Sequence, residues 1–373
     1  MMSNLNQVPV NDLTRWDSDD LKHVTAAMSE VAHSGYFMLG AKTKALEALL
    51  GKITDGKHAV GCANGTDALV LALLGLGIQA GDHVATVANA GGYATGAILR
   101  VGAIPILVDV DGATAQMSAE SLKQVFAEVP TVKAIIVTHL YGLMVDIMQL
   151  SKMASSHGAV VVEDCAQSIG ASSNGRNAGA WGDAATFSFY PTKNLGCLGD
   201  GGAVAFSDLA CAVIAREIAQ YGWSSRYVVS RDSGINSRLD EIQAAILLAR
   251  MPALTTNNSR RRSIIARYSQ SLSPDRQMIW ANDETFVGHL AVMTTPCRNV
   301  DVEKLAVANI STSVHYPIAD HMQPAWQKYF VGVSLPNTEI VTRSIVTLPC
   351  FPLLTDVEVG RVCDVLSTLN SAN

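Results

Sequence analysis

The 373-residue sequence predicts an α/β protein that is built on a mainly parallel sheet. Short runs rich in β-branched residues alternate with helical patterns, which is typical of parallel strands joined by helical crossovers. Several of these runs are continuously apolar, as expected for strands that helices cover on both faces. Ligands of such sheets bind at the carboxyl ends of the strands, so polar residues at those ends are the first candidates for a site.

Six strands are expected in the first part of the chain, with helices between many of them. Helices are predicted over residues 68–78, 118–129 and 147–158, and each has the apolar spacing of a packed helix. The strands are HVATVA, IPILVDV, AIIVTHLYG, AVVVEDCAQ, AATFSFY and GGAVAF, which begin at His83, Ile104, Ala134, Ala159, Ala184 and Gly201.

The pattern changes after about residue 245. An amphipathic helix with a basic face is expected over residues 257–272, and the strands that follow are fewer and more broken. A Pro-punctuated segment, VHYPIADHMQP, comes next. We therefore expect a large domain over residues 1–245 and a smaller C-terminal α/β domain over residues 246–373, a length that suits two domains.

Composition argues against several classes of partner. The net charge is −6 and no long basic run occurs, which argues against nucleic acid and anionic membranes. No window has the ~18 uninterrupted apolar residues of a membrane span, and the N-terminus lacks a signal pattern. The seven cysteines include no CxxC pair, so we expect reduced thiols, a cytoplasmic protein and no metal site.

Lys193 and Asp164 are the candidate catalytic pair. Lys193 follows a strand and a Pro turn in FSFYPTKNLG, and Asp164 ends the apolar run AVVVED. Such a lysine can form a Schiff base with pyridoxal 5'-phosphate (PLP) and then move the substrate proton, while the carboxylate keeps the ring nitrogen protonated. Gln167, one turn further on, can reach the phenolic oxygen of the ring. The alternative is a solvated surface lysine and a strand-end carboxylate that caps a turn.

Phosphate binders are expected where a helix begins. Gly65 and Thr66 precede a strong helical run, so backbone amides, a hydroxyl and the positive end of the helix dipole are available to an anion. Ser188 lies just before the lysine turn and can add a second hydroxyl. The alternative is an ordinary N-cap in which Thr66 or Asp67 caps the helix.

Two further motifs complete the expected site. Gly91 and Gly92 let the backbone approach a flat group, and Tyr93 can then stack on a pyridine ring; the alternative is a tyrosine packed in a loop. Asn236 and Arg238 precede a helical pattern and can complete a phosphate or carboxylate site. The alternative is an N-cap for a helix that begins at about residue 237.

The strings NGTDAL, EDCAQSIGA, FSFYPTKNLG, GDGGAVAF, INSRLDEIQAAIL and VHYPIADHMQPAW together resemble the DegT/DnrJ/EryC1/StrS aminotransferases. The resemblance extends from about residue 35 to the C-terminus. It implies the fold-type I architecture of PLP-dependent aminotransferases and a homodimer with active sites at the subunit interface.

The resemblance assigns a role to each matching position. The NAGGY loop differs from the commoner TFVAT pattern, although its tyrosine falls where the family places a ring-stacking aromatic. By resemblance, Lys193 is the Schiff-base lysine, Asp164 is the partner of the ring nitrogen, Gln167 lies beside the phenolic oxygen, and Tyr93 is the stacking aromatic. The phosphate binders implied by the resemblance are Gly65, Thr66, Ser188 and, from the neighbouring subunit, Asn236. The implied substrate-side residues are Tyr221, Arg238, His315 and Tyr316.

The implied reaction is transamination from L-glutamate to a keto group of a dTDP- or UDP-linked deoxy sugar. The wording of YPTKNLG and GDGG resembles the branch that aminates C3 more than the branch that aminates C4. One alternative is a PLP-dependent sugar dehydratase, in which a histidine replaces the lysine. Others are a non-catalytic PLP-binding regulator on the same scaffold and an α/β binding module without PLP.

Overall fold

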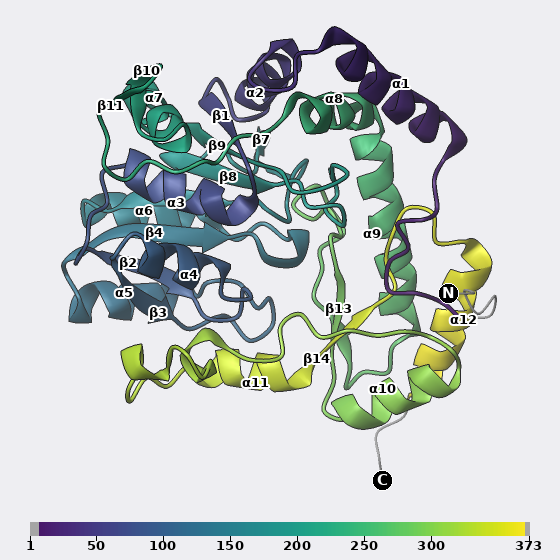
Figure 1. Cartoon of the computed structure of the whole chain (residues 1–373). Coiled ribbons are helices and arrows are strands. Elements are labelled where there is room, and N and C mark those ends of the chain that lie inside the picture. The colour runs from purple at the N-terminus through teal and green to yellow at the C-terminus, as the bar shows by residue number, and fades with distance from the viewer. Residues whose placement is uncertain (1–6, 370–373) are drawn as a thin grey trace.

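The computed structural model describes residues 7–369 and shows a central sheet of seven strands (Figure 1). All neighbouring strands run parallel except at β9, which is antiparallel to both β8 and β1. The expected α/β fold class is therefore confirmed, and so are the six predicted strands. In sheet order the strands are β1 His58–Cys62, β9 Gly202–Phe206, β8 Ala184–Ser188, β5 Val160–Asp164, β4 Val132–Thr138, β2 His83–Val87 and β3 Ile104–Val108.

Helices cover both faces of this sheet. One face packs against α3 Gly65–Gly75, α4 Tyr93–Arg100 and α7 Leu209–Ala219, and the other packs against α2 Ala41–Ile53, α5 Ala119–Glu128 and α6 Ile147–Ser156. Strand β4 shows how the faces divide, because Ala134 and Ile136 join the first core whereas Ile135 and Val137 join the second. This two-sided burial explains why the strands read as continuous apolar runs.

The helix predicted over residues 68–78 corresponds to α3, which spans Gly65–Gly75. Every residue of α3 from Asp67 to Leu73 is buried, and the helix lies between the sheet and its neighbours α4 and α7. A helix that is apolar on all sides needs such an enclosed position. Its N-terminus therefore has a fixed place at the edge of the sheet.

The first helix and the region after α7 lie along one side of the molecule. Helix α1 Ser18–Ser34 packs on α8 Glu241–Arg250, which also contacts α2. Between α7 and α8 lies an exposed hairpin made of β10 Trp223–Ser225 and β11 Val228–Val229. A second small hairpin, β6 Ser172–Ser173 with β7 Arg176–Asn177, follows β5.

A three-stranded antiparallel sheet follows the long helix α9 Leu254–Ser271. Its strands are β12 Gln277–Met278, β13 Ala291–Thr294 and β14 Ile345–Leu348, and the helices beside it are α10 Arg298–Val307, α11 Pro336–Ser344 and α12 Asp356–Ser367 (Figure 1). The boundary at residue 245 between two domains stays a prediction. The expected basic face of α9 is incomplete, because Arg261 is buried and donates to the Cys350 carbonyl oxygen at 2.9 Å.

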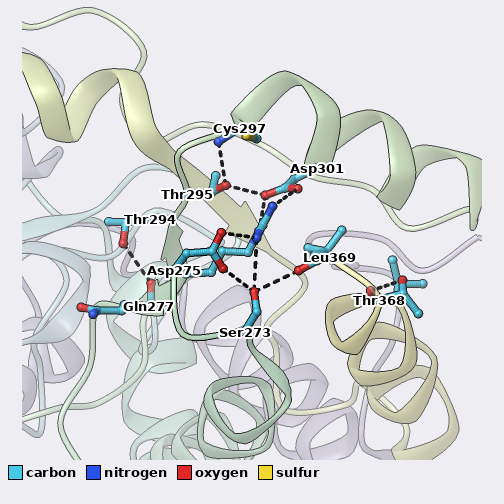
Figure 2. Close-up of polar contacts among 11 residues, drawn as sticks. Ser273, Asp275, Gln277, Thr294, Thr295, Cys297, Asp301, Thr368 and Leu369 are labelled. Carbon is cyan, nitrogen blue, oxygen red and sulfur yellow. Dashed lines mark hydrogen bonds and ion pairs between the residues drawn. The ribbon is translucent and has the colours of Figure 1, made fainter. Parts of the chain in front are cut away.

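A buried ion pair fixes α10 to the start of β12 (Figure 2). Arg276 donates to both carboxylate oxygens of Asp301 at 2.8 and 2.9 Å, and Asp301 also accepts from the Thr295 hydroxyl at 2.5 Å. Ser273 joins the network by donating to the Leu369 carbonyl oxygen at 2.9 Å. The C-terminal end of the described chain is therefore attached to the same polar cluster.

The Pro-punctuated segment crosses from the small sheet back to the large one. The Asp320 amide donates to the Ala88 carbonyl oxygen at 2.8 Å, just after β2. Farther along, the amides of Asn337 and Thr338 at the start of α11 donate to the Asp109 carboxylate, which follows β3. These contacts hold residues 315–338 against the carboxyl ends of the large sheet.

Candidate active site

A cavity of about 800 Å³ opens at the carboxyl ends of the parallel strands. Residues from the large sheet, α3, α4 and the crossing segment line it together. The expected site residues among its lining are Gly65, Thr66, Tyr93, Asp164, Gln167, Ser188, Lys193, His315 and Tyr316.

Lys193 lies in a tight turn, where its amide donates to the Tyr190 carbonyl oxygen at 2.8 Å. A side chain at Gly196 would meet the Pro191 carbonyl oxygen at 2.6 Å, so this turn requires a glycine. Burial lowers the pKa of Lys193 to about 8, and the nearby Asp164 opposes that shift. Near pH 8 a substantial fraction of this amine is therefore neutral and nucleophilic.

Asp164 ends β5 and has few partners for a buried carboxylate. One oxygen accepts from the Ala166 amide at 3.1 Å, and the other lies 3.4 Å from the Thr138 hydroxyl. Burial raises the pKa of Asp164, although the Ala166 amide and the charge of Lys193 oppose the shift. A cation placed in the cavity would stabilise the ionised carboxylate.

The carboxylate of Glu163, the preceding residue, has its hydrogen-bond partners on the opposite face of β5. Its carboxylate accepts from the amides of Gly179, Trp181 and Gly182 at 2.7 to 2.9 Å, and it lies 3.1 Å from His139 Nε2. Burial opposes ionisation of Glu163, but His139 and these amides outweigh it and lower the pKa.

His139, which the sequence places at a strand end, therefore belongs to the support of β5 and is absent from the lining of the cavity. Its Nδ1 accepts from the Val145 amide at 3.3 Å, which leaves the proton on the nitrogen that faces Glu163. Cys165 brings a third potential metal ligand within 4.8 Å of these two residues. Because the Glu163 oxygens are already occupied by amides, we interpret the group as structural.

Gln167 links the β5 end to the crossing segment. Its side-chain oxygen accepts from the Tyr141 amide at 2.6 Å, and its amide group donates to the Tyr316 hydroxyl at 3.2 Å. The Tyr141 hydroxyl in turn donates to the His315 carbonyl oxygen at 2.6 Å. His315 and Tyr316 are thereby held beside the β5 end of the cavity.

The start of α3 has the form expected of an anion site. Asn64 caps the helix by accepting from the Asp67 amide at 2.8 Å, so the alternative in which Thr66 or Asp67 is the cap is wrong. A side chain at Gly65 would lie 2.7 Å from the Ser188 Cβ, so two of the predicted phosphate binders, Gly65 and Ser188, lie next to each other. The first-turn amides of α3 and the Ser188 side chain therefore lie close together at the cavity, which Thr66 also lines.

Tyr93 begins α4 directly after Gly91 and Gly92, whose φ angles are +79° and +78°. Its side chain is half exposed and meets the Tyr316 ring edge-on, with 6.1 Å between the centroids. The ring therefore stands at the wall of the cavity, where the sequence expects a stacking aromatic.

Three expected residues lie outside this cavity and form a cluster of their own. Arg238 donates to the Asn236 side-chain oxygen at 3.0 Å, and its guanidinium lies over the Tyr221 ring at 5.4 Å. Asp240 is the N-cap of α8, so the alternative in which Asn236 or Ser237 caps that helix is wrong. Tyr221 and Asn236 are exposed and Arg238 is partly exposed, and none of the three lines the cavity that the other predicted site residues share.

The comparison with protein families decides the identity of this fold. The model of the DegT/DnrJ/EryC1/StrS aminotransferase family matches residues 18–367. The chain belongs to this family. The expected fold type is confirmed as well, because two solved aminotransferase-like structures superpose on nearly the whole chain.

Among solved structures, DesV of S. venezuelae in complex with a ketimine intermediate has a TM-score of 0.92 and 35% identity, with 97% of this chain and 98% of that chain covered. NtdA of Bacillus subtilis with bound cofactor PMP has a TM-score of 0.91 and 29% identity, with 98% and 85% covered. This DegT-family chain therefore has the architecture of PLP-dependent aminotransferases.

Among curated relatives, a UDP-N-acetyl-3-dehydro-α-D-glucosamine 3-aminotransferase of Acidithiobacillus ferrooxidans is 34% identical, with 98% of each chain covered. A "pleiotropic regulatory protein" of Geobacillus stearothermophilus is 37% identical, with 93% of this chain and 94% of the relative covered. The family thus includes proteins named for amination and for regulation.

The residues of the cavity fit PLP. The buried amine and carboxylate lie at one end, and the amides and hydroxyls at the start of α3 lie where a phosphate could bind. A side chain at Gly202 would meet the Asn64 carbonyl at 2.4 Å, so the glycine of the GDGG run is needed to seat this helix start. The donor set and the cavity volume are therefore consistent with the cofactor of the family.

Sequence reasoning missed several residues of the cavity, among them the buried His289. Its Nδ1 lies 2.9 Å from the Asn194 side-chain oxygen, and Asn194 follows Lys193 directly. Burial and the charge of Lys193 lower the pKa of His289 well below its usual range, so the imidazole is neutral. The only signal was a histidine in VGHLAVM before a short strand, and that pattern alone does not predict a site.

No helix among residues 7–369 is both long enough and apolar enough to cross a bilayer. All seven cysteines are free.

Proposed function

We propose that the protein is a transaminase that moves an amino group from L-glutamate to the C3 keto group of a dTDP- or UDP-linked deoxy sugar. One observation carries the proposal: Lys193 and Asp164 line the same cavity at the strand ends of a DegT-family fold. The relative named as a 3-aminotransferase of a UDP-linked sugar supports the position on the sugar. The product is an amino sugar for the glycosylation of a polysaccharide or natural product.

PLP, when bound, supplies an aldehyde and an electron-withdrawing ring that stabilises negative charge on the substrate carbon. Lys193 would hold the aldehyde and, once released, would move the substrate proton, since its pKa of about 8 suits a general base near neutral pH. Asp164 would pair with the ring nitrogen, and Gln167 would lie beside the phenolic oxygen.

The cavity wall would orient the cofactor. The amides of Gly65 and Thr66 and the Ser188 hydroxyl would bind the phosphate at the start of α3, where the helix dipole favours an anion. Tyr93 would lie against the ring, which restricts its tilt. His315 and Tyr316 would face the substrate.

We also propose a homodimer in which Asn236, Tyr221 and Arg238 of one subunit complete the site of the other. The cluster lies beside the hairpin of β10 and β11, where Tyr227 is 70% exposed and Val229 is 64% exposed. Apolar side chains gathered on a short hairpin are typical of an interface. The free cysteines support a reducing compartment, and we propose the cytoplasm.

The rival functions lack a supporting observation in this chain. A sugar dehydratase of this fold would carry a histidine at position 193, where this chain has lysine. One relative is named as a regulator, but an intact lysine and carboxylate in one cavity favour catalysis in this chain. Loss of either residue would be expected in a protein that only binds PLP.

The decisive experiment offers L-glutamate with a panel of 3-keto and 4-keto dTDP- and UDP-linked sugars to the PLP-loaded protein. Mass spectrometry and NMR of the product identify the aminated carbon. We expect turnover of a 3-keto sugar and formation of 2-oxoglutarate. Turnover restricted to 4-keto sugars would correct the carbon, and the absence of turnover with any sugar would refute the proposed activity.

A further inference from the structure

Asp320 is a buried acid whose position needs an explanation. Its side chain is 1% exposed, and it lies beside an apolar cluster. One carboxyl oxygen accepts from the Thr95 hydroxyl at 2.5 Å, whereas the other makes no hydrogen bond of good geometry within residues 7–369, although the nearby Gly92 amide favours the ionised carboxyl group. A carboxyl group with an unsatisfied oxygen in such surroundings destabilises a fold, so its benefit must lie elsewhere. The cluster is formed by Ala88, Leu107, Ala319, Phe330 and Leu335, with Trp326 packed against it.

The partner of Asp320 lies in the first turn of α4, the helix that Tyr93 begins. The residue before the helix is Gly92, which offers no side-chain cap. Two successive glycines at positive φ give this turn little rigidity of its own, because glycine has more accessible backbone conformations than any other residue. The place of Tyr93 must therefore be fixed from outside the turn.

The crossing segment supplies that restraint. A side chain at Gly91 would lie 2.9 Å from the Tyr316 ring, and one at Gly92 would lie 2.8 Å from the Trp326 ring, so both glycines are covered closely. The segment itself is attached at His315 and Tyr316 through Tyr141 and Gln167. The hydrogen bond from Thr95 to Asp320 attaches the crossing segment to α4. Together with the contacts at Tyr316 and Trp326, this bond holds the segment against the wall of the cavity.

We propose that Asp320 is a positioning residue for the cofactor pocket: by accepting from Thr95 it holds the first turn of α4, and thereby Tyr93, in place. The proposal rests on the role of Tyr93 at the cofactor ring given above. Without this restraint Tyr93 must be ordered at the moment of binding, and the lost conformational freedom weakens cofactor affinity. Asp320 acts through Thr95 and touches neither cofactor nor substrate.

Four variants separate this role from a general loss of stability. Thr95→Val removes the hydroxyl and keeps the shape, and Asp320→Ala removes the acceptor. Asp320→Asn keeps an acceptor for Thr95 and serves as the conservative rescue. Thr342→Val is the matched control, because Thr342 is a buried helical threonine whose hydroxyl has no partner among the described residues.

The first measurement is the dissociation constant of PLP, taken from the visible absorbance of the bound cofactor. We expect Thr95→Val and Asp320→Ala to raise it about 3- to 10-fold, the equivalent of one lost hydrogen bond. Asp320→Asn and Thr342→Val should stay within about twofold of the wild type. In a Tyr93→Ala background the effect of Thr95→Val should largely disappear, because its target is gone.

The second measurement needs no cofactor: amide hydrogen exchange of residues 93–97 in the PLP-free chain. Exchange should be faster in Thr95→Val and unchanged in Thr342→Val. Unchanged exchange and unchanged PLP affinity in Thr95→Val would overturn the proposal, and so would an effect that persists in full in the Tyr93→Ala background. If Asp320→Ala fails to fold, Thr95→Val decides. If the wild type binds PLP but aminates no sugar, the proposed activity is wrong. The PLP affinities and exchange rates of the variants would still test the role of Asp320.

Discussion

The pH dependence of stability should change when Asp320 becomes asparagine. Burial raises the pKa of Asp320 from an ordinary value of 3.8 to about 7 in the folded chain, and the Thr95 hydroxyl and the Gly92 amide oppose the shift. Between these two pH values the folded chain holds a proton that the unfolded chain has released. Unfolding therefore releases a proton, so this residue makes the free energy of unfolding rise as the pH falls from 7 towards 4.

The size of the effect follows from the difference between the two pKa values. Each unit of difference corresponds to about 1.4 kcal/mol, so ionised Asp320 lowers the free energy of unfolding by up to ~4 kcal/mol at high pH. Between pH 8 and pH 5.5 about half of this penalty is relieved, or ~2 kcal/mol. Asparagine has no charge to lose and keeps the acceptor for Thr95, so the variant should lack this contribution.

The assay is urea unfolding of the PLP-free chain, followed by circular dichroism at pH 5.5, 6.5 and 8. The quantity of interest is the free energy of unfolding of Asp320→Asn minus that of the wild type. Other titrating groups contribute equally to both proteins and cancel in the difference. We expect this difference to increase by ~2 kcal/mol from pH 5.5 to pH 8. Asp232→Asn, at an exposed position, is the control and should give a constant difference.

A difference for Asp320→Asn that is constant within about 0.5 kcal/mol would refute the reasoning, since it would mean that the carboxyl group does not change its protonation on unfolding. A change of the opposite sign would be equally damaging. It would imply that the folded chain favours the ionised form, and hence that the Thr95 hydroxyl and the Gly92 amide stabilise the charge by more than burial opposes it.

Four further variants test the rest of the molecule. Lys193→Ala should abolish the visible band of PLP-loaded protein; a retained band would place the covalent link elsewhere. Asp164→Asn should keep the cofactor but lower turnover by roughly 10²- to 10⁴-fold, and near-normal turnover would remove it from its proposed role. Arg238→Ala should raise the KM for donor or sugar nucleotide more than the dissociation constant of PLP, so unchanged kinetics would contradict a substrate role. Asp301→Asn should lower the free energy of unfolding by ~1–3 kcal/mol, because it removes the charge-assisted pair with Asp301 while Asp275 still pairs with Arg276 at 2.9 Å; urea unfolding checks this, and no measurable change would argue against a stabilising pair there.

Six of the seven strands of the large sheet were predictable because each of the six carries its own local signal. Continuous apolar runs such as β4 and β5 exist only where helices cover both faces, and the structure shows that arrangement. Strand β1 was missed, since HAVGC is short and contains a glycine, and it pairs with β9 far along the chain. Local pattern does not reveal a strand whose place depends on a distant partner.

The cavity residues were predictable where an ionisable side chain lies at or just after the end of a strand, as Asp164 and Lys193 do. The helix caps were not predictable: Asn64 and Asp240 cap the helices whose caps were expected at neighbouring residues. Any small polar residue near a helix start can cap it, and the choice depends on a backbone angle that is set elsewhere. His289 and Asp320 were missed for a related reason, because each acts through a contact with residues far away in sequence.

The adjacent residues Glu163 and Asp164 have different roles on the same strand: Glu163 supports the fold, whereas Asp164 faces the cavity. Successive side chains of a strand point to opposite faces, so two adjacent carboxylates meet different surroundings. Glu163 has its charge balanced by three amides and His139, and its pKa is lowered. Asp164 has a raised pKa and a single amide partner at 3.1 Å, which leaves its charge to be stabilised by a cation in the cavity. Exchanging the two residues would put the shorter side chain out of reach of the 179–182 loop and a longer one into the cavity, so the order Glu-Asp, and not merely the presence of two acids, is what the site requires.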